Sequence, residues 1–332
     1  MAKTNGTPGS KRGAPAAPDQ LALHSVSYAG VWRGQARLTL EEFVPRAAAL
    51  GYRSVMLVGK RPHLSLLDYD APRRARLRDL LDAHGVGVSC VAAYTDFTAG
   101  ADRADIPNAE MQAVHVTELS RAARDLGASV VRVFTAYERP DQLSYPEAWE
   151  RCVGGIRDCA RRAADFGVTI AVQNHHDLAL DHEGMIELLD QVGEPNCKAA
   201  FDAWAPAIQG LSGEALAAAV RAIAPHVVHT TVADYRRRPR YRYVPGLSTY
   251  AREVDLSQAV PMGDGFVDYG TFFATLREAG FRGSIAYEIC SPIRGGGSLE
   301  NLDACARRFR SYMEGQISPG ASCAAAPTLA SA

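Results

Sequence analysis

The sequence lacks the features that mark several common classes of protein. It contains no apolar run long enough to cross a bilayer and no apolar segment near its start like that of a signal peptide. It has no excess of charge of either sign, because 36 Lys and Arg face 37 Asp and Glu, a formal net charge of -1. Such a chain offers no field to attract nucleic acid or an anionic membrane. We therefore expect a cytoplasmic protein whose partners are small molecules or other proteins.

The sequence also lacks the cysteine spacing of a disulfide framework. Its seven cysteines are odd in number, scattered and never spaced as CxxC, which indicates reduced thiols. Both ends are rich in Gly, Pro, Ala and polar residues. We therefore expect disordered tails at residues 1–20 and 316–332 around a single catalytic domain at residues 21–315.

What the chain does contain is a regular alternation of strand-like and helix-like segments. Apolar runs alternate with amphipathic stretches that end at glycines suited to a left-handed helix stop, such as 40–51 and 269–280. The strand-like runs are 21–28, 54–59, 86–94, 129–136, 168–175, 197–204, 226–233 and 283–290. Eight pairs of strand and helix in a domain of this length predict a (β/α)8 TIM barrel. The alternative, an open doubly wound sheet, would need a GxGxxG turn that SYAGVWRGQARLT does not provide.

Four polar residues lie in otherwise apolar strand sequence in the second half of the predicted barrel. They are Gln173, Asp202, His229 and Glu288, one for each of the last four strands. A lone carboxylate is costly to bury without a partner, and barrels of this kind form their sites where strands end. These donors together suit a divalent cation, with Mn²⁺ as our first choice and Mg²⁺, Co²⁺ or Zn²⁺ as alternatives. Taken singly, each residue could equally be a structural hydrogen-bond partner.

The same residues resemble a known family. Their order, with PMGDGFVDYGTFFATLREAGFRGSIAYEIC leading into the last of them, resembles the sugar phosphate isomerase/epimerase superfamily of xylose-isomerase-like barrels. The resemblance covers nearly all of residues 21–315 and implies a TIM barrel enzyme that acts on small sugars. In that family a divalent metal is held by one residue from each of strands five to eight. In order these are Glu, Asp, His (or Gln) and Glu. The resemblance therefore implies that Gln173, Asp202, His229 and Glu288 are metal ligands.

Gln173 is the position at which the sequence departs from the family. In the family's ketose 3-epimerases the first and last glutamates also transfer protons on opposite faces of an enediolate, and an amide cannot take up a proton. Glu288 keeps its place as a catalytic group. Another base has to replace the first glutamate, and His175 is our first candidate because strand alternation puts it on the same face as Gln173. His176 is the second candidate.

Other polar and aromatic residues at the ends of the predicted strands are candidates for binding the substrate. They are Lys60, Arg61, His63, Tyr94, Trp204, Asp234 and Arg294. The segment 60–63 could bind hydroxyls, a carboxylate or a phosphate, or be a salt-bridged loop. The segment 234–250 contains five arginines and four tyrosines and is long for a barrel connection. It could be a lid, an anion contact, or the interface of a homo-oligomer or hetero-oligomer, with a solvated loop as the alternative.

These observations predict a metal-dependent isomerase or epimerase for a small sugar or oxo-sugar. It would take a proton from the carbon next to a carbonyl group and stabilise the enediolate that forms. A metal-dependent lyase with a histidine base, either a dehydratase or a C- or O-glycoside deglycosidase acting on 3-oxo-sugars, is the alternative that the missing glutamate favours. A non-catalytic sugar-binding barrel is a second alternative. A nuclease similar to endonuclease IV is disfavoured, because the net charge provides no footprint for a phosphate backbone.

Overall fold

The strands form the predicted barrel. The computed structural model describes residues 20–101, 103, 105–137, 143–176, 178–290 and 292–315. An eight-stranded parallel sheet with the order β6-β5-β4-β3-β2-β1-β10-β7 lies at its centre. The strands are β1 (Leu21–His24), β2 (Ser54–Val58), β3 (Gly87–Ala92), β4 (Val130–Val133), β5 (Thr169–Gln173), β6 (Cys197–Ala200), β7 (His229–Val232) and β10 (Ser284–Tyr287). A parallel bridge between Ala199 and Val227 links β6 to the segment before β7, so the barrel is nearly closed.

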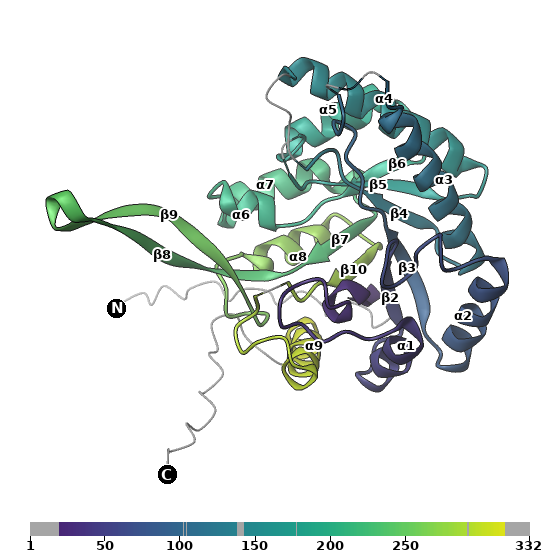
Figure 1. Cartoon of the computed structure of the whole chain (residues 1–332), viewed down its shortest axis with the longest axis horizontal. Coiled ribbons are helices and arrows are strands. Elements are labelled where there is room, and N and C mark those ends of the chain that lie inside the picture. Colours follow the sequence, from purple (N-terminus) through teal and green to yellow (C-terminus); the bar gives the residue numbers. More distant parts are fainter. Residues whose placement is uncertain are drawn as a thin grey trace, which may run out of the picture.

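The helices surround the strands on the outside (Figure 1). They are α1 (Leu40–Ala49), α2 (Ala71–Ala83), α3 (Asn108–Asp125), α4 (Tyr145–Ala164), α5 (His182–Val192), α6 (Trp204–Ile208), α7 (Gly213–Ile223), α8 (Tyr269–Glu278) and α9 (Leu299–Met313). Short 3-10 helices lie at Ser25–Tyr28, Ala224–His226 and Pro245–Leu247. Among the described residues, no helix combines the length and apolar character that crossing a membrane requires. The tails predicted at residues 1–20 and 316–332 lie outside the described residues, apart from Gln20.

Local sequence signals set the ends of these helices. Helix α1 begins at Thr39, whose side chain accepts a hydrogen bond from the Glu42 amide while the Glu42 carboxylate accepts one from the Thr39 amide, a capping box. It ends before Gly51, which has a φ of 84°. The glycines that we expected to stop three further helices, Gly85, Gly127 and Gly280, also have positive φ. The helix boundaries therefore follow from side chains close in sequence.

Side chains that alternate along each strand separate into two layers. One layer packs between the strands and the helices and contains the larger apolar residues, such as Leu23, Val131 and Ile285. The other lies inside the barrel and is built from Ala22, Met56, Cys90, Ala92 and Ala286. Because most of these inner residues are small, the barrel has room for longer polar side chains from the neighbouring strands.

A long β-hairpin interrupts the regular order of strands and helices between β7 and α8. Its strands are β8 (Asp234–Val244) and β9 (Thr249–Val260), which pair only with each other, in antiparallel fashion. Figure 1 shows this hairpin projecting outward from the barrel. We call it the arm. The sequence predicted a loop here, because a run of arginines and Pro239 hid the alternation that marks a strand.

Candidate active site

Asp202 lies just beyond the end of β6 and is held by its neighbours on both carboxylate oxygens. Its Oδ2 accepts a 2.7 Å hydrogen bond from Gln173 Nε2, at the end of β5, and its Oδ1 accepts a 3.0 Å bond from the Trp204 amide. Asp202 and Gln173 are both buried. Burial raises the pKa of Asp202 to about 7, against the opposing effect of the Gln173 hydrogen bond. Asp202 can therefore exist with or without its proton near neutral pH.

Glu288 follows β10 and faces the same part of the barrel. Its carboxylate lies 3.9 Å from Nε2 of the buried His24 and accepts a 3.3 Å hydrogen bond from the Cys290 thiol. Burial raises its pKa, and the nearby positive charge of Arg132 works in the opposite direction. The negative charge of Glu288 in turn contributes to the raised pKa of Asp202. The two carboxyl groups are thus close enough to affect each other's ionisation.

Arg132 is a residue of the site that the sequence analysis missed. It lies on β4, is only 1% exposed, and packs its guanidinium 3.9 Å from the centre of the Phe134 ring and 4.9 Å from that of Tyr94. One of its terminal nitrogens donates a 3.3 Å bond to the Ala93 carbonyl, whereas its Nε has no hydrogen-bond partner. The sequence does contain a signal for it, since an arginine lies between two valines in VVRVF. A charge that points inward from a buried strand is costly unless it is paired, so such a residue indicates a site.

The position of His229 differs from the expected one. His229 is the first residue of β7 and pairs with Ser284, four residues before Glu288. At about 3.3 Å per residue, this separates the two positions by about 13 Å along the strand direction. The inward position of β7 nearer to Glu288 is occupied by Thr231, which pairs with Ala286.

The His229 ring is also engaged. Its Nδ1 shares a 2.7 Å hydrogen bond with Ser284 Oγ, and its Nε2 lies 3.4 Å from Thr231 Oγ1. Burial, and then the charge of Arg132, lower its pKa to about 3. The ring is therefore a neutral, hydrogen-bonded group below the carboxylates.

The predicted four-donor set does not fit a divalent cation in this arrangement. His229 is too deep, and the Arg132 charge nearby opposes another cation. Among the described residues, no group of three or more His, Cys, Asp or Glu side chains could hold a metal ion. Gln173, Asp202, His229 and Glu288 therefore stay a predicted ligand set for Mn²⁺ or a related ion, and the depth of His229 argues against its being complete.

His175 and His176 lie in an aromatic cluster on the side of the barrel nearest β4 and β5. The centres of the two rings are 4.2 Å apart, and both rings contact Phe134. The centre of the His176 ring also lies 4.0 Å from that of Tyr137. Burial, followed by the effects of His176 and Arg132, lowers the pKa of His175 to about 3. The pKa of His176 is also lowered by burial. Both rings are neutral at physiological pH and are weak bases, contrary to the basis on which His175 was our first candidate.

Two of the predicted substrate-binding residues after β2 have structural roles in this arrangement. His63 is fully buried, and its two ring nitrogens hydrogen-bond to Ser25 Oγ at 2.9 Å and to the Leu38 carbonyl at 3.0 Å. Arg61 makes two 2.7 Å bonds to Asp68, which corresponds to the salt-bridged loop that was the alternative. Neither side chain is directed to the carboxylates.

Lys60 and Tyr94, by contrast, lie beside Arg132. The Lys60 ammonium lies 3.9 Å from the centre of the Tyr94 ring, whose other neighbour is the Arg132 guanidinium. Burial, and then the Arg132 charge, lower the pKa of Lys60. A substrate that reached this side of the barrel would meet two positive charges and an aromatic ring.

Trp204 and Tyr235 form an aromatic wall on the opposite side. Their ring centres are 3.9 Å apart, and the Tyr235 hydroxyl lies 3.1 Å from the thiol of Cys290, the neighbour of Glu288. The sequence analysis named Trp204 and missed Tyr235, which belongs to the first residues of the arm. Because β8 begins beside the barrel mouth, the arm contributes a residue to the site.

Asp234 and Arg294, which we expected to bind substrate, are used within the protein. The Asp234 carboxylate accepts 2.9 Å bonds from the amides of Tyr235, Gly263 and Gly265, which fixes the arm to the turn before α8. Arg294 is paired with Asp264. Both charged groups therefore have partners inside the fold, and their role in substrate binding stays a prediction.

Comparisons with known proteins agree with the fold. The model of the xylose isomerase-like TIM barrel family matches residues 44–309. The rhizopine catabolism protein MocC of Rhizobium meliloti is 29% identical over 270 residues, 75% of this chain and 74% of that protein. D-psicose 3-epimerase from Clostridium cellulolyticum H10, solved with D-tagatose, has a TM-score of 0.68 at 15% identity, with 89% of this chain and 99% of that chain covered. The probable 3-DHS dehydratase AsbF from Bacillus anthracis has a TM-score of 0.63 at 16% identity, with 88% and 98% covered.

Proposed function

Because the chain belongs to the xylose isomerase-like TIM barrel family, we propose that it is an enzyme that removes a proton next to the carbonyl group of a small sugar or oxo-sugar. The relatives found by comparison include sugar epimerases and a dehydratase, which supports this reaction class. The observation on which the proposal depends is the group formed by Glu288, Asp202 and Arg132 inside the barrel. It contains a base, an acid and a positive charge.

Glu288 is the group that takes the proton from carbon. Burial raises the pKa of Glu288, which makes its carboxylate a stronger base than an exposed glutamate, while the Arg132 charge favours the ionised form. Unlike His175, whose pKa is about 3, Glu288 can both accept a proton and hold it. Glu288 thus takes the catalytic role that the sequence analysis divided between Glu288 and the histidines.

Asp202 is suited to the opposite task of giving a proton to the carbonyl oxygen. With a pKa of about 7 it is partly protonated under physiological conditions, and its bonds to Gln173 and the Trp204 amide fix its orientation. Pairs of carboxyl groups whose environments give them different proton affinities commonly divide acid and base roles in this way. Protonation of the oxygen as the carbon loses its proton yields a neutral enediol.

Arg132 supplies the positive charge that stabilises the developing negative charge. Its guanidinium is fixed between aromatic rings and is shielded from water, conditions under which a charge acts strongly on its surroundings. Because Arg132 and Lys60 lie together beside Tyr94, we place the oxygen-rich end of the substrate on this side. Trp204 and Tyr235 would then contact the apolar face of the sugar.

A single base on one face of the substrate determines the outcome of the reaction. Inversion at a carbon requires a proton to leave from one face and return to the other, and Gln173 cannot provide the second base. When Glu288 returns the proton to the neighbouring carbon and the Asp202 carboxylate takes the proton of the hydroxyl group that becomes the new carbonyl, the result is aldose–ketose isomerisation. We therefore favour an isomerase over a 3-epimerase, although epimerases are among the structures with the same fold.

Elimination is the second candidate, and the Asp202 proton favours it. The intermediate formed when Glu288 removes the proton can instead expel a leaving group from the next carbon. The Asp202 carboxyl group, with a pKa of about 7, can protonate that group as it departs. A lyase would use Glu288 as its base, in place of the histidine that the sequence suggested. The resemblance to a dehydratase fold is compatible with it.

Hydrogen exchange in D₂O tests both candidates. Aldoses, ketoses and 3-oxo-glycosides are incubated with the protein, with EDTA or with added Mn²⁺, and followed by NMR. We expect deuterium to enter the sugar without inversion at the carbon, at a rate that EDTA does not change. Glu288→Gln should abolish this exchange, whereas Glu278→Gln, a control at an exposed position, should leave it unchanged. Release of a leaving group would select the lyase. Epimeric products would contradict the single base, and no exchange with any substrate would overturn the enzyme proposal.

A further inference from the structure

The two faces of the arm differ sharply in character. Residues opposite one another in an antiparallel pair lie on the same face, so the register assigns each side chain to one face. One face has the ion pairs that Arg240 and Arg242 make with Glu253. The other face has the large apolar and aromatic residues Tyr241, Tyr243, Tyr250 and Val254. We call this second face the aromatic face.

The aromatic face is the more exposed of the two. Val254 is 86% exposed, Tyr250 67% and Tyr241 60%, whereas Ala251 and Glu253 on the opposite face of β9 are partly covered. Soluble proteins rarely leave a row of large apolar side chains in water unless the row meets a partner. A two-stranded hairpin by itself is also only marginally stable in water. The arm therefore has the properties of a surface that is covered in an assembly.

The charge of the arm indicates the kind of surface that covers it. Residues 235–258 contain six arginines and two carboxylates, a formal charge of +4, which leaves -5 on the remainder of the chain. Two arms would repel each other, while the body of a second copy would attract an arm. The aromatic face itself includes Arg252, which lies 3.0 Å from Asp255 and could also pair with carboxylates at the edge of such a contact.

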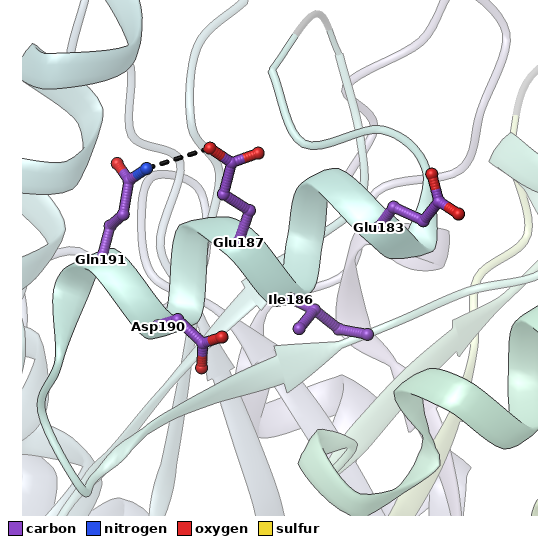
Figure 2. Close-up of a pocket in the computed structure, with 5 residues that line it drawn as sticks. All are labelled: Glu183, Ile186, Glu187, Asp190 and Gln191. Carbon is purple, nitrogen blue, oxygen red and sulfur yellow. Dashed lines mark hydrogen bonds between the residues drawn. The ribbon is translucent and has the colours of Figure 1, made fainter.

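An acidic hollow of suitable character lies on α5. Figure 2 shows Glu183, Glu187 and Asp190 around it, with Ile186 and Gln191. It has a volume of about 490 Å³, and the three carboxylates form no ion pair with any described residue. A second hollow adjoins it and adds the rings of Tyr145 and Trp149 from α4. We call these two hollows the α4–α5 groove.

From these observations we propose that the aromatic face of the arm docks into the α4–α5 groove of a second copy of this chain. Figure 1 shows the arm projecting away from α4 and α5 of its own barrel, so the contact has to be made between molecules. In a dimer with twofold symmetry each arm would enter the groove of the other copy, and the contact would be made twice. Arg252 would pair with Glu183 or Glu187, and the tyrosines would pack near Ile186 and Trp149.

Measurement of the oligomeric state of the full chain tests the proposal. We expect light scattering and sedimentation to show self-association that weakens as salt rises. Tyr241→Thr with Val254→Thr, or Glu183→Lys with Glu187→Lys, should weaken it about tenfold or more. Ala251→Thr on the opposite face is the matched control. Combining Glu183→Lys and Glu187→Lys with Arg252→Glu should restore part of the association, because the charges of the contact are then exchanged.

Three results would overturn the proposal. The first is a wild-type chain that stays monomeric at every accessible concentration. The second is a groove variant that associates as well as wild type while the arm variant does not, which would place the arm elsewhere. The third is an arm that binds an unrelated nucleic acid duplex at physiological salt and shows no self-association. Circular dichroism and melting temperature show whether each variant is folded, so loss of fold is distinguished from loss of the contact.

Discussion

The side chain of Gln173 donates a 2.7 Å hydrogen bond to Asp202 Oδ2 inside the barrel. This bond uses the amide that replaces the glutamate of the resembled family, and it holds an acidic group whose pKa is about 7. Gln173→Glu would put two carboxylates at this short distance, and they could not both be ionised. We expect the variant to lose stability above pH 7 and to approach wild-type stability near pH 5. Gln173→Leu, which adds no charge, should lose similar stability at both pH values, and melting temperatures at pH 5 and pH 8 distinguish the two.

Glu288 and His175 are rival candidates for the base. We expect Glu288→Gln to reduce kcat by a factor of about 10² to 10⁴, the usual contribution of a positioned base. His175→Ala should reduce it by about tenfold or less, since a ring with a pKa of about 3 is a weak base and contributes mainly packing against Phe134. Single-turnover proton exchange measures both. The opposite ranking would return the role to His175.

Replacing Arg132 should lower the activity without lowering the stability of the protein. Burying a charge with an unsatisfied Nε is costly, so Arg132→Met should leave the melting temperature unchanged or raise it. The same change removes the positive charge beside Glu288, and we expect kcat to fall by about 10² or more. Arg132→Lys keeps the charge without the planar contact with Phe134 and should retain intermediate activity. A variant that loses stability and activity together would indicate a structural role only.

His63 should make the protein less stable in acid. Burial lowers its pKa from 6.5 to about 4 in the folded state, so between these values the unfolded chain binds a proton that the folded chain does not. Stability from this group is fully present above pH 6.5 and is lost as the pH falls to 4, by about 3 kcal/mol. His63→Gln should therefore show a shallower decline over this range in urea unfolding. An unchanged slope would show that His63 does not titrate in this way.

The barrel could be predicted from the sequence because its signals are local. Apolar runs of strand length, capped helices and glycine stops such as Gly51 recur at each step, and each depends on residues that are neighbours in the chain. The inward positions of Gln173, Asp202 and Glu288 also follow from alternation, once the strands are known.

The depth of a residue inside the barrel could not be predicted in the same way. The run 226–233 does not reveal that the strand begins at His229, and only pairing with Ser284 shows how far this ring lies from Glu288. Arg132 was missed because its role depends on Tyr94 and Glu288, which follow other strands. The arm was missed because its strands pair only with each other, and the arginines and Pro239 hide the alternation in β8.

Gly265 gives a last test, at the turn that anchors the arm. A Cβ at this position would lie 1.8 Å from Asp234 Oδ1 and 2.5 Å from the Tyr235 carbonyl, so Gly265→Ala has to displace the carboxylate that accepts three backbone bonds. We expect a loss of about 2 to 4 kcal/mol in the free energy of unfolding.

Gly270 is the matched control for this change. It lies in the first turn of α8, where an added Cβ would come no closer than 3.6 Å to Asp268, and alanine is the better helix former. Gly270→Ala should therefore be neutral or stabilising by up to about 1 kcal/mol. Because Asp234 fixes the start of β8, Gly265→Ala should also increase amide exchange at the base of the arm and spare the helices far from it. Uniform exchange changes across the barrel would show that the anchor is not local.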